Sequence, residues 1–148
     1  MADIVVRRGL QSDLEAVFGL STQLVTGPQG PQLDDFVTVF NNVVRWRENE
    51  TNVLYVAEED EVVIGYTLMT VSRLLHTPGL TAQIQELVVD ESARGRGVGS
   101  ALVRTNESYA QQRGIRRITM GTARLGGFYR RLGYQVTAEF YSKQLPIG

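Results

Sequence analysis

Three glycines at alternate positions, Gly95, Gly97 and Gly99, are the clearest chemical signal in the sequence. Such a run leaves backbone N–H groups uncovered, and a helix that starts there adds partial positive charge, so the turn can hold a phosphate. Arg94 and Arg96 supply two cations that could neutralise a pyrophosphate. The segment therefore predicts an anion site between an apolar strand and a helix.

Two common phosphate motifs fit this turn poorly. A P-loop needs Lys followed by Ser or Thr after its last glycine, whereas Gly99 is followed by Ser100 and Ala101. The dinucleotide fingerprint would put Ser100 at its third glycine, and the next strand does not end in the carboxylate that holds a ribose. Both motifs are therefore set aside.

A third motif matches the spacing Arg94-x-x-Gly97-x-Gly99, which lies after a Val-Val strand and before an amphipathic helix. This arrangement resembles the acetyl-CoA loop of the GNAT superfamily of N-acetyltransferases. The later segment Phe128-Tyr-Arg-Arg-Leu-Gly-Tyr134 is similar to the family's Phe-Tyr-x-x-x-Gly-Phe segment. Two motifs in order, with a strand between them, are far more specific than a glycine-rich turn alone.

The resemblance implies an α/β (α+β) fold with a mixed, mostly antiparallel central sheet and flanking helices. Its strands at residues 80–90 and 116–120 would splay apart and leave a V-shaped slot for the pantetheine of acetyl-CoA, paired like a strand. The backbone contacts would come from Leu87, Val88 and Val89, whose side chains also suit an ordinary core. The pyrophosphate would be held by Arg94, Gly95, Arg96, Gly97, Val98, Gly99 and Ser100. The alternative for this turn is a helix-capping loop with solvated arginines.

Tyr129 lies where many family members have the tyrosine that protonates the departing thiolate. A phenol can supply that proton at a cost of only about 2 kcal/mol. The alternative is a core aromatic ring with its hydroxyl at the surface.

Glu86 is the residue predicted to remove a proton from the acceptor. A primary amine is mostly ammonium at neutral pH, and reaching its nucleophilic form costs about 4 to 5 kcal/mol. Strand alternation predicts Ile84, Glu86 and Val88 on one face of their strand, opposite Gln85, Leu87 and Val89. A carboxylate is a weak direct base, so Glu86 would need burial or a relaying water. A surface or salt-bridged glutamate is the alternative.

Two positions are weaker candidates. The asparagine that the family usually carries about seven residues before the tyrosine is replaced by Thr122, which has fewer donors and less reach. His76 is the single histidine and has no acidic neighbour in sequence, so we expect an ordinary surface residue. The expected reaction needs no metal.

Composition narrows the remaining possibilities. The 148 residues predict one domain spanning 1–148, and the net charge of −1 gives no field to attract nucleic acid or an acidic membrane. The chain has no cysteine, which excludes disulfides and a thiol nucleophile. No apolar run reaches membrane-spanning length and the N-terminus lacks the order of a secretion signal, so we expect a cytoplasmic protein.

Patterning predicts the elements around the two motifs. We expect a strand at 4–8, a helix to about residue 24 behind a Ser12–Glu15 capping box, and a mobile loop at 26–31. A second helix from about residue 31 would bury Leu33, Phe36, Phe40, Val43 and Val44. Further predictions are a hairpin of strands 52–58 and 61–71, a helix that Gly114 ends, a helix around 125–132, and strands at 134–136 and 139–145.

The predicted function is transfer of an acetyl group from acetyl-CoA directly to a primary amine of a small molecule, peptide or protein. A backbone N–H of Val88 or Val89 would hold the oxyanion. The alternative function is a non-catalytic acyl-CoA sensor or interaction module. Succinyl-CoA or propionyl-CoA could also be the acyl donor. The sequence does not identify the acceptor amine, and it does not decide between a monomer and a homodimer.

Overall fold

The structure is a computed structural model that describes residues 3–25, 28, 30–45, 51–122 and 127–146. Its described strands form one five-stranded sheet in chain order. They are β1 (Ile4–Arg8), β2 (Asn52–Glu59), β3 (Val62–Arg73), β4 (Leu80–Val89) and β5 (Ile118–Met120). The helices are α1 (Leu14–Ser21), α2 (Leu33–Arg45), α3 (Val98–Gln112) and α4 (Gly127–Arg131).

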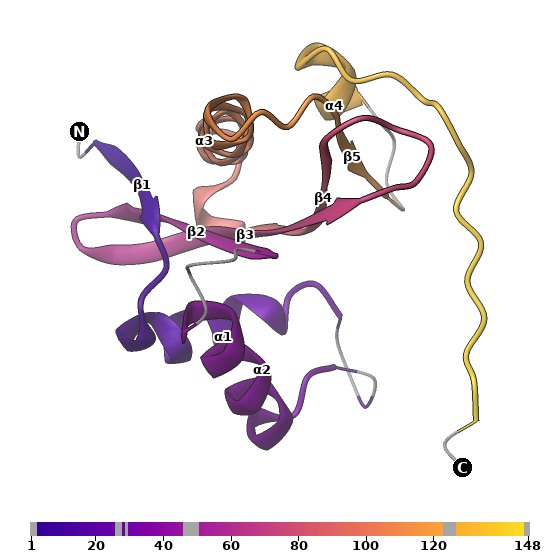
Figure 1. Cartoon of the computed structure of the whole chain (residues 1–148). Helices are drawn as coiled ribbons and strands as arrows, with labels where there is room; N and C mark the ends of the chain where they lie inside the picture. The colour runs from indigo at the N-terminus through magenta and orange to yellow at the C-terminus, as the bar shows by residue number, and fades with distance from the viewer. Residues whose placement is uncertain (1–2, 26–27, 29, 46–50, 123–126, 147–148) are drawn as a thin grey trace.

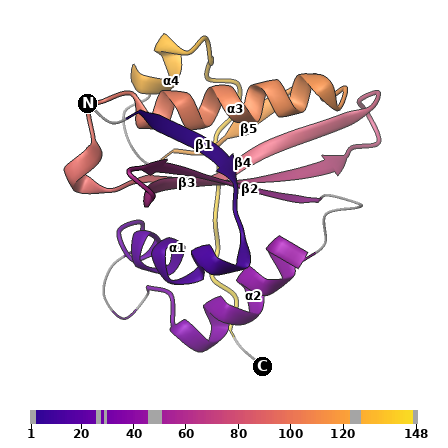
Figure 2. The same ribbon diagram turned by 90° about the vertical axis from the view of Figure 1, so that its left-hand side faces the viewer.

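The helices cover both faces of the sheet (Figures 1 and 2). α1 and α2 lie on one face, and α3 and α4 lie on the other. The α1/α2 face buries Val17, Phe40, Tyr66 and Val88. On the other face, α3 packs its apolar stripe on β2, β3 and β4, where a buried Asn106 donates to Thr67 Oγ1 over 2.7 Å.

Strands β4 and β5 splay apart, as the resemblance implies. Strands β1 to β4 pair antiparallel, whereas β4 and β5 pair parallel and only between Ala82–Ile84 and Ile118–Met120. No described residue pairs with the outer edge of β4 from Gln85 to Val89. The V-shaped slot therefore opens at the end of β4 that leads into the glycine-rich turn.

A bulge in β4 corrects the predicted alternation. Leu68 pairs with Glu86 and Met69 pairs with Ile84, so Gln85 is the extra residue. Ile84 consequently lies in the α3-side core, while Glu86 and Val88 face the α1/α2 side. The prediction that Ile84 shares a face with Glu86 was wrong. Side chains of a strand alternate between its two faces, and the extra residue Gln85 places Ile84 and Glu86 on opposite faces.

Several local predictions are confirmed. The β2–β3 hairpin turns at Asp60 and Glu61, whose φ angles of 52° and 65° are the left-handed values that a tight hairpin turn needs. α3 ends at Gln112 with Arg113 as its C-cap, and Gly114 directly after it has φ of 79°. The first strand at Ile4–Arg8 is also found. The predicted loop at 26–31 and the start of the helix at 125–132 lie partly outside the described residues.

Other local predictions were wrong. The capping box is replaced by a short 3-10 turn in which Asp13, not Ser12, accepts the Leu10 N–H at 2.7 Å, and α1 ends at Ser21. Leu33 is half exposed at the start of α2. Residues 134–146 form no strand: Tyr134 packs on the core, and the chain after it extends past the side of the sheet toward the C-terminal end (Figure 1). Among the described helices, none is long and apolar enough to span a bilayer.

Candidate active site

One cavity of about 630 Å³ lies where β4 leaves the sheet and α3 begins. Its walls come from the free end of β4, the glycine-rich turn, α4 and the residues that follow α1. The lining includes Glu86, Leu87, Val88, Val89, Arg94, Gly95, Gly97, Val98, Gly99, Ser100 and Tyr129. All but one of the residues predicted for catalysis or cofactor binding therefore line a single space.

The glycine-rich turn ends in an uncovered helix start. Gly95 and Gly97 have φ of 79° and 83°, which side-chain-bearing residues rarely adopt. Gly97 is the N-cap of α3 without a capping side chain, and the helical ladder begins with Ala101 N–H donating to its carbonyl at 3.0 Å. The N–H groups of Val98, Gly99 and Ser100 precede that ladder, so they can converge on an anion.

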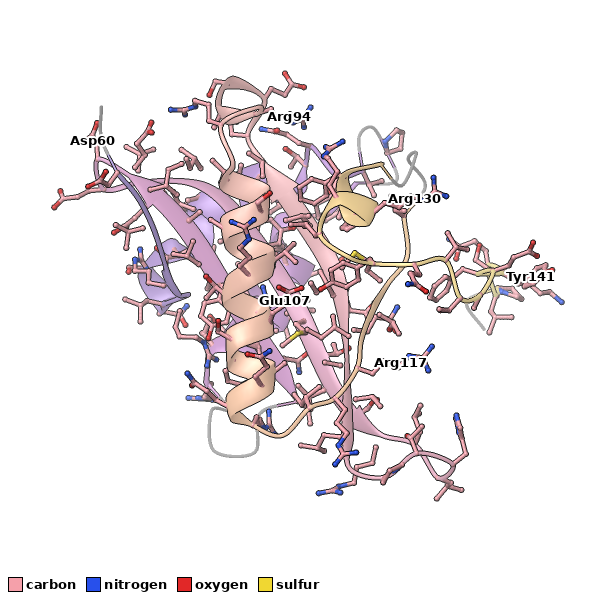
Figure 3. The ribbon with its side chains drawn as sticks, turned by 90° about the horizontal axis from the view of Figure 1, so that it is seen from above. Asp60, Arg94, Glu107, Arg117, Arg130 and Tyr141 are labelled. Carbon is pink, nitrogen blue, oxygen red and sulfur yellow. The ribbon has the colours of Figure 1, made fainter. Side chains whose placement is uncertain are left out.

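The two arginines of the turn differ. Arg94 lines the cavity and lies at the N-terminal end of α3 (Figure 3), where its Nε donates to the Val89 carbonyl at 3.1 Å. Arg96 is the one predicted residue outside the lining, because its guanidinium pairs with Glu59 of β2 at 2.8 Å. An anion in the cavity therefore meets Arg94 directly, whereas Arg96 would have to leave its partner.

Gly99 sets the position of α4. A Cβ at Gly99 would lie 3.2 Å from the ring of Phe128, closer than ordinary van der Waals contact. The missing side chain thus lets α4 approach α3, and α4 carries Tyr129 into the cavity wall. The ring of Tyr129 packs edge-on against Phe128 at 5.0 Å and Tyr134 at 6.3 Å between centroids.

The backbone of β4 presents alternate residues to the open edge. Asp90 N–H donates to the Ile64 carbonyl of β3 at 2.8 Å, and a Cβ at Gly65 of β3 would lie 2.9 Å from the Val88 carbonyl oxygen. Because antiparallel pairing alternates, the N–H and C=O groups of Leu87 and Val89 point away from β3. Val88 lines the cavity, but its backbone faces the sheet.

Glu86 is held by a neighbour that the sequence analysis missed. The hydroxyl of Tyr66 on β3 donates to Glu86 Oε1 at 2.7 Å, and the Tyr66 ring is buried. Burial, with the Glu86 carboxylate beside it, raises the pKa of Tyr66 well above its usual range, so the hydroxyl stays a donor. No other described donor contacts this carboxylate. Tyr66 of β3 pairs with Val88 of β4, and this pairing, which local spacing does not reveal, brings the Tyr66 side chain beside Glu86.

Further lining residues were not predicted for the site. Gln23 and Leu24, just after α1, line the cavity, and Gln23 Nε2 donates to Asp90 Oδ1 at 2.8 Å. Hydrogen bonds from Ser92 and Gln23 lower the pKa of Asp90. Phe128 and Arg131 of α4 also line the space, and they belong to the second motif although no site role was predicted for them. Gln23 and Leu24 carry no spacing signal, since only the fold brings them to the turn.

The two weaker candidates, Thr122 and His76, differ in their position relative to the cavity. Thr122 follows β5 and lines the cavity, as does Gly121 beside it. His76 is exposed in the β3–β4 loop and is absent from the lining. Tyr134 donates its hydroxyl to Glu107 of α3 at 2.8 Å, and desolvation of the ring with that bond raises the pKa of Tyr134. Tyr134 is therefore an anchor of the segment after α4.

Known proteins resemble part of this chain. A mouse protein, N-alpha-acetyltransferase 80, is 37% identical over 75 residues, covering 51% of this chain and 23% of the relative. Rice glucosamine 6-phosphate N-acetyltransferase 1 is 37% identical over 57 residues, covering 38% of this chain and 34% of the relative. The matched stretch is thus about a quarter to a third of these relatives.

A solved structure extends the likeness to the whole fold. A protein from Bacillus halodurans, described as a transcriptional regulator, superposes with a TM-score of 0.86 at 25% identity, covering 97% of this chain and 100% of that one. The profile of the acetyltransferase (GNAT) family matches residues 22–134, which include the turn, both splayed strands and Tyr129. The chain therefore belongs to the GNAT family of acetyltransferases.

Proposed function

We propose that this protein transfers the acetyl group of acetyl-CoA to a primary amine of a small molecule or of a peptide or protein. The observation that carries the proposal is one cavity bounded by an uncovered helix N-terminus, an open strand edge, a carboxylate and a phenol. When bound, acetyl-CoA supplies an acetyl group activated as a thioester. The residues fit such a ligand, since it pairs an anionic pyrophosphate with an amide-rich arm.

The proposed cofactor contacts follow from these walls. The N–H groups of Val98, Gly99 and Ser100, with the Arg94 side chain, would bind the pyrophosphate, and Arg96 would assist after leaving Glu59. Leu87 and Val89 would pair their outward backbone groups with the amides of the pantetheine arm. Arg94 must then release the Val89 carbonyl, which the anion's attraction for its guanidinium favours.

The proposed proton transfers use two residues. Glu86 would accept a proton from the ammonium form of the acceptor, directly or through water, which leaves a neutral amine to attack the thioester carbon, while the Tyr66 hydroxyl holds Oε1 of Glu86 in place. Tyr129 would donate its phenolic proton to the departing thiolate sulfur. The Val89 N–H, which points to the open edge, would stabilise negative charge developing on the acetyl oxygen. The acceptor would enter beside Gln23 and Leu24.

The first test measures thiol release from acetyl-CoA with a panel of amine acceptors: peptides with free N-termini, amino sugars and their phosphates, aminoglycosides, polyamines and amino acids. The Tyr129→Phe variant is measured beside the natural chain, with Tyr141→Phe as a control on an exposed ring. We expect turnover with one acceptor class and a fall in kcat of about 10- to 1,000-fold in Tyr129→Phe only. Acetyl-CoA affinity by calorimetry should stay within about threefold.

Two outcomes would contradict the proposal. Unchanged kcat in Tyr129→Phe would remove the phenol from the reaction. Tight acetyl-CoA binding without thiol release for any acceptor, in both the natural chain and Glu86→Gln, would favour a sensor of acyl-CoA. Parallel assays with propionyl-CoA and succinyl-CoA show whether the protein prefers to transfer a different acyl group.

A further inference from the structure

The side chain of Arg94 covers a backbone group at the open edge of β4. Its Nε donates to the Val89 carbonyl oxygen at 3.1 Å, and both residues line the cavity of about 630 Å³. The short 3-10 turn Glu91–Ala93 makes this contact possible, because it folds the chain back after Asp90, whose carbonyl accepts the Ala93 N–H at 2.9 Å. Arg94 therefore lies beside the end of the strand that it follows.

The covered carbonyl belongs to the set that a strand-like ligand would use. Backbone groups of Leu87 and Val89 face the open edge of β4, so both of their carbonyls are directed at a ligand in the slot. Arg94 already occupies the carbonyl of Val89. A pantetheine arm, whose amides carry N–H donors, would have to displace the guanidinium before it could pair with the whole of this edge.

The hold of Arg94 on Val89 is weak compared with an ion pair. Among the residues that the structure describes, no carboxylate pairs with Arg94, whereas the neighbouring Arg96 pairs with Glu59 at 2.8 Å. A cation donates a stronger hydrogen bond to an anion than to a neutral carbonyl, and a phosphate takes the guanidinium through two parallel N–H groups. A pyrophosphate near Arg94 would therefore draw its side chain away from Val89.

The anion and the strand edge share one cavity. The uncovered N–H groups at the start of α3 form one wall of it, and the end of β4 forms another. Arg94 lies between the two elements in sequence and lines the same space, so one flexible side chain can serve either group. Occupation of the anion wall and exposure of the Val89 carbonyl are thus linked.

We propose that Arg94 determines which acyl donors this protein accepts, an inference that rests on the proposed function. Arg94 covers the Val89 carbonyl until a pyrophosphate draws the guanidinium to the start of α3, and the pantetheine arm then pairs with residues 87–89. Thioesters that carry a pyrophosphate uncover the edge themselves, whereas pantetheine thioesters without one meet a covered carbonyl. Independent anion and amide subsites would give no such coupling.

Binding of two fragments tests the coupling. NMR titrations follow the backbone amide signals of isotope-labelled protein with pantetheine alone, and with pantetheine at saturating ADP. Because Arg94 leaves only a fraction of molecules competent for pantetheine, we expect ADP to lower the pantetheine Kd about three- to tenfold, which is the effect of one hydrogen bond. In Arg94→Met, which keeps the aliphatic stem and loses the donors, the pantetheine Kd without ADP should already be lower by that factor, and ADP should not change it.

Arg104→Met is the matched control for the fragment titrations. Arg104 is an exposed arginine of α3 outside the cavity lining, so this variant loses the same charge without touching Val89. Its pantetheine Kd and its response to ADP should match those of the natural chain. A pantetheine Kd that ADP leaves unchanged in the natural chain, or an equal gain in both variants, would overturn the proposal.

Steady-state kinetics separates donor selection from a merely structural role of Arg94. With one acceptor amine, Arg94→Met should lower kcat/KM for acetyl-CoA about tenfold and raise kcat/KM for S-acetyl-pantetheine about three- to tenfold. Damage to the turn would lower both values, so a fall with both donors would contradict the proposal.

Failure of the proposed function has a different signature. A natural chain that binds neither acetyl-CoA nor pantetheine would remove the proposed function, and donor selection with it. A natural chain that acetylates an amine from acetyl-CoA, but whose Arg94→Met variant binds pantetheine no more tightly, would overturn the role of Arg94 alone. If acetyl-CoA binds without thiol release, the fragment titrations still decide whether Arg94 couples the two ends of the ligand.

Discussion

The two arginines of the turn have the same charge but different surroundings. Arg94 lines the cavity, whereas Arg96 already pairs with Glu59 at 2.8 Å. We expect Arg94→Ala to weaken acetyl-CoA binding about tenfold, since one charge-assisted contact is worth about 1.5 kcal/mol. Arg96→Ala should weaken acetyl-CoA binding less than about threefold. Arg96 must give up its ion pair with Glu59 before it can contact the anion, and that loss offsets most of the free energy gained.

Calorimetry at two ionic strengths measures both arginine variants. The Arg94 effect should shrink as salt screens the charge of the ligand. Glu59→Gln is the matched control: by freeing Arg96 it should strengthen binding slightly, and that gain should vanish when Arg96→Ala is added. Equal losses in the two single variants would show that Arg96 swings into the cavity at no cost.

Tyr66 acts through the carboxylate that it holds. Tyr66→Phe removes the 2.7 Å hydrogen bond to Glu86 and keeps the buried ring, so we expect kcat to fall about 5- to 10-fold with an unchanged KM for acetyl-CoA. In a Glu86→Gln background the same change should have little further effect, since the two residues work as one unit. Additive losses in the kinetic cycle would mean that Tyr66 supports the fold only.

At the scale of elements, the helix α3 has a left-handed glycine at each end. Gly97 has φ of 83° and Gly114 has φ of 79°, and a Cβ at either position would meet no other atom within 4 Å. Alanine at either should therefore cost about 1 kcal/mol of folding free energy through backbone strain alone. Only Gly97→Ala should also weaken acetyl-CoA binding, by about tenfold, because it moves N–H groups at the cavity.

Thermal unfolding and calorimetry of the two glycine variants give the comparison. Similar losses in Tm with different affinities would assign the anion site to the N-terminal end of α3. Loss of affinity in Gly114→Ala as well would instead mean that the whole helix shifts, and the local assignment would fail.

The same elements show what sequence patterns can and cannot predict. The glycine-rich turn, the splayed strands and α4 were predictable because each depends on local spacing and a known motif. The face of Ile84 was not, since the Gln85 bulge arises from pairing with β3. Tyr66 was missed for the same reason, because its hydrogen bond to Glu86 joins two strands that only the fold places side by side. The strands expected at 134–136 and 139–145 are not formed, because alternating apolar residues favour extended backbone but do not supply a neighbouring strand to pair with.

At the scale of the whole molecule, one ion pair links the first strand to the helical layer beneath the sheet. Arg7 of β1 makes two 2.9 Å hydrogen bonds to Asp13, just before α1, and a third bond of 3.2 Å to Glu58 of β2. The Asp13 side chain is nearly buried. Removing its charge leaves the guanidinium without its main partner, so Asp13→Asn should lower the free energy of unfolding by about 2 kcal/mol at pH 7.

The same pair predicts how stability depends on pH. Hydrogen bonds from Arg7 lower the pKa of Asp13 in the folded protein below its unfolded value. A carboxylate with a lowered folded pKa stabilises the fold fully above the unfolded pKa of about 4, and this contribution is lost as the pH falls through the folded value. Denaturant unfolding between pH 7 and pH 3 should therefore show the difference between the natural chain and Asp13→Asn shrinking toward acid. Asp34→Asn, an exposed acid at the start of α2, should stay within about 0.5 kcal/mol of the natural chain throughout. A difference that persists unchanged at pH 3 would mean that Asp13 stabilises the fold through packing rather than charge.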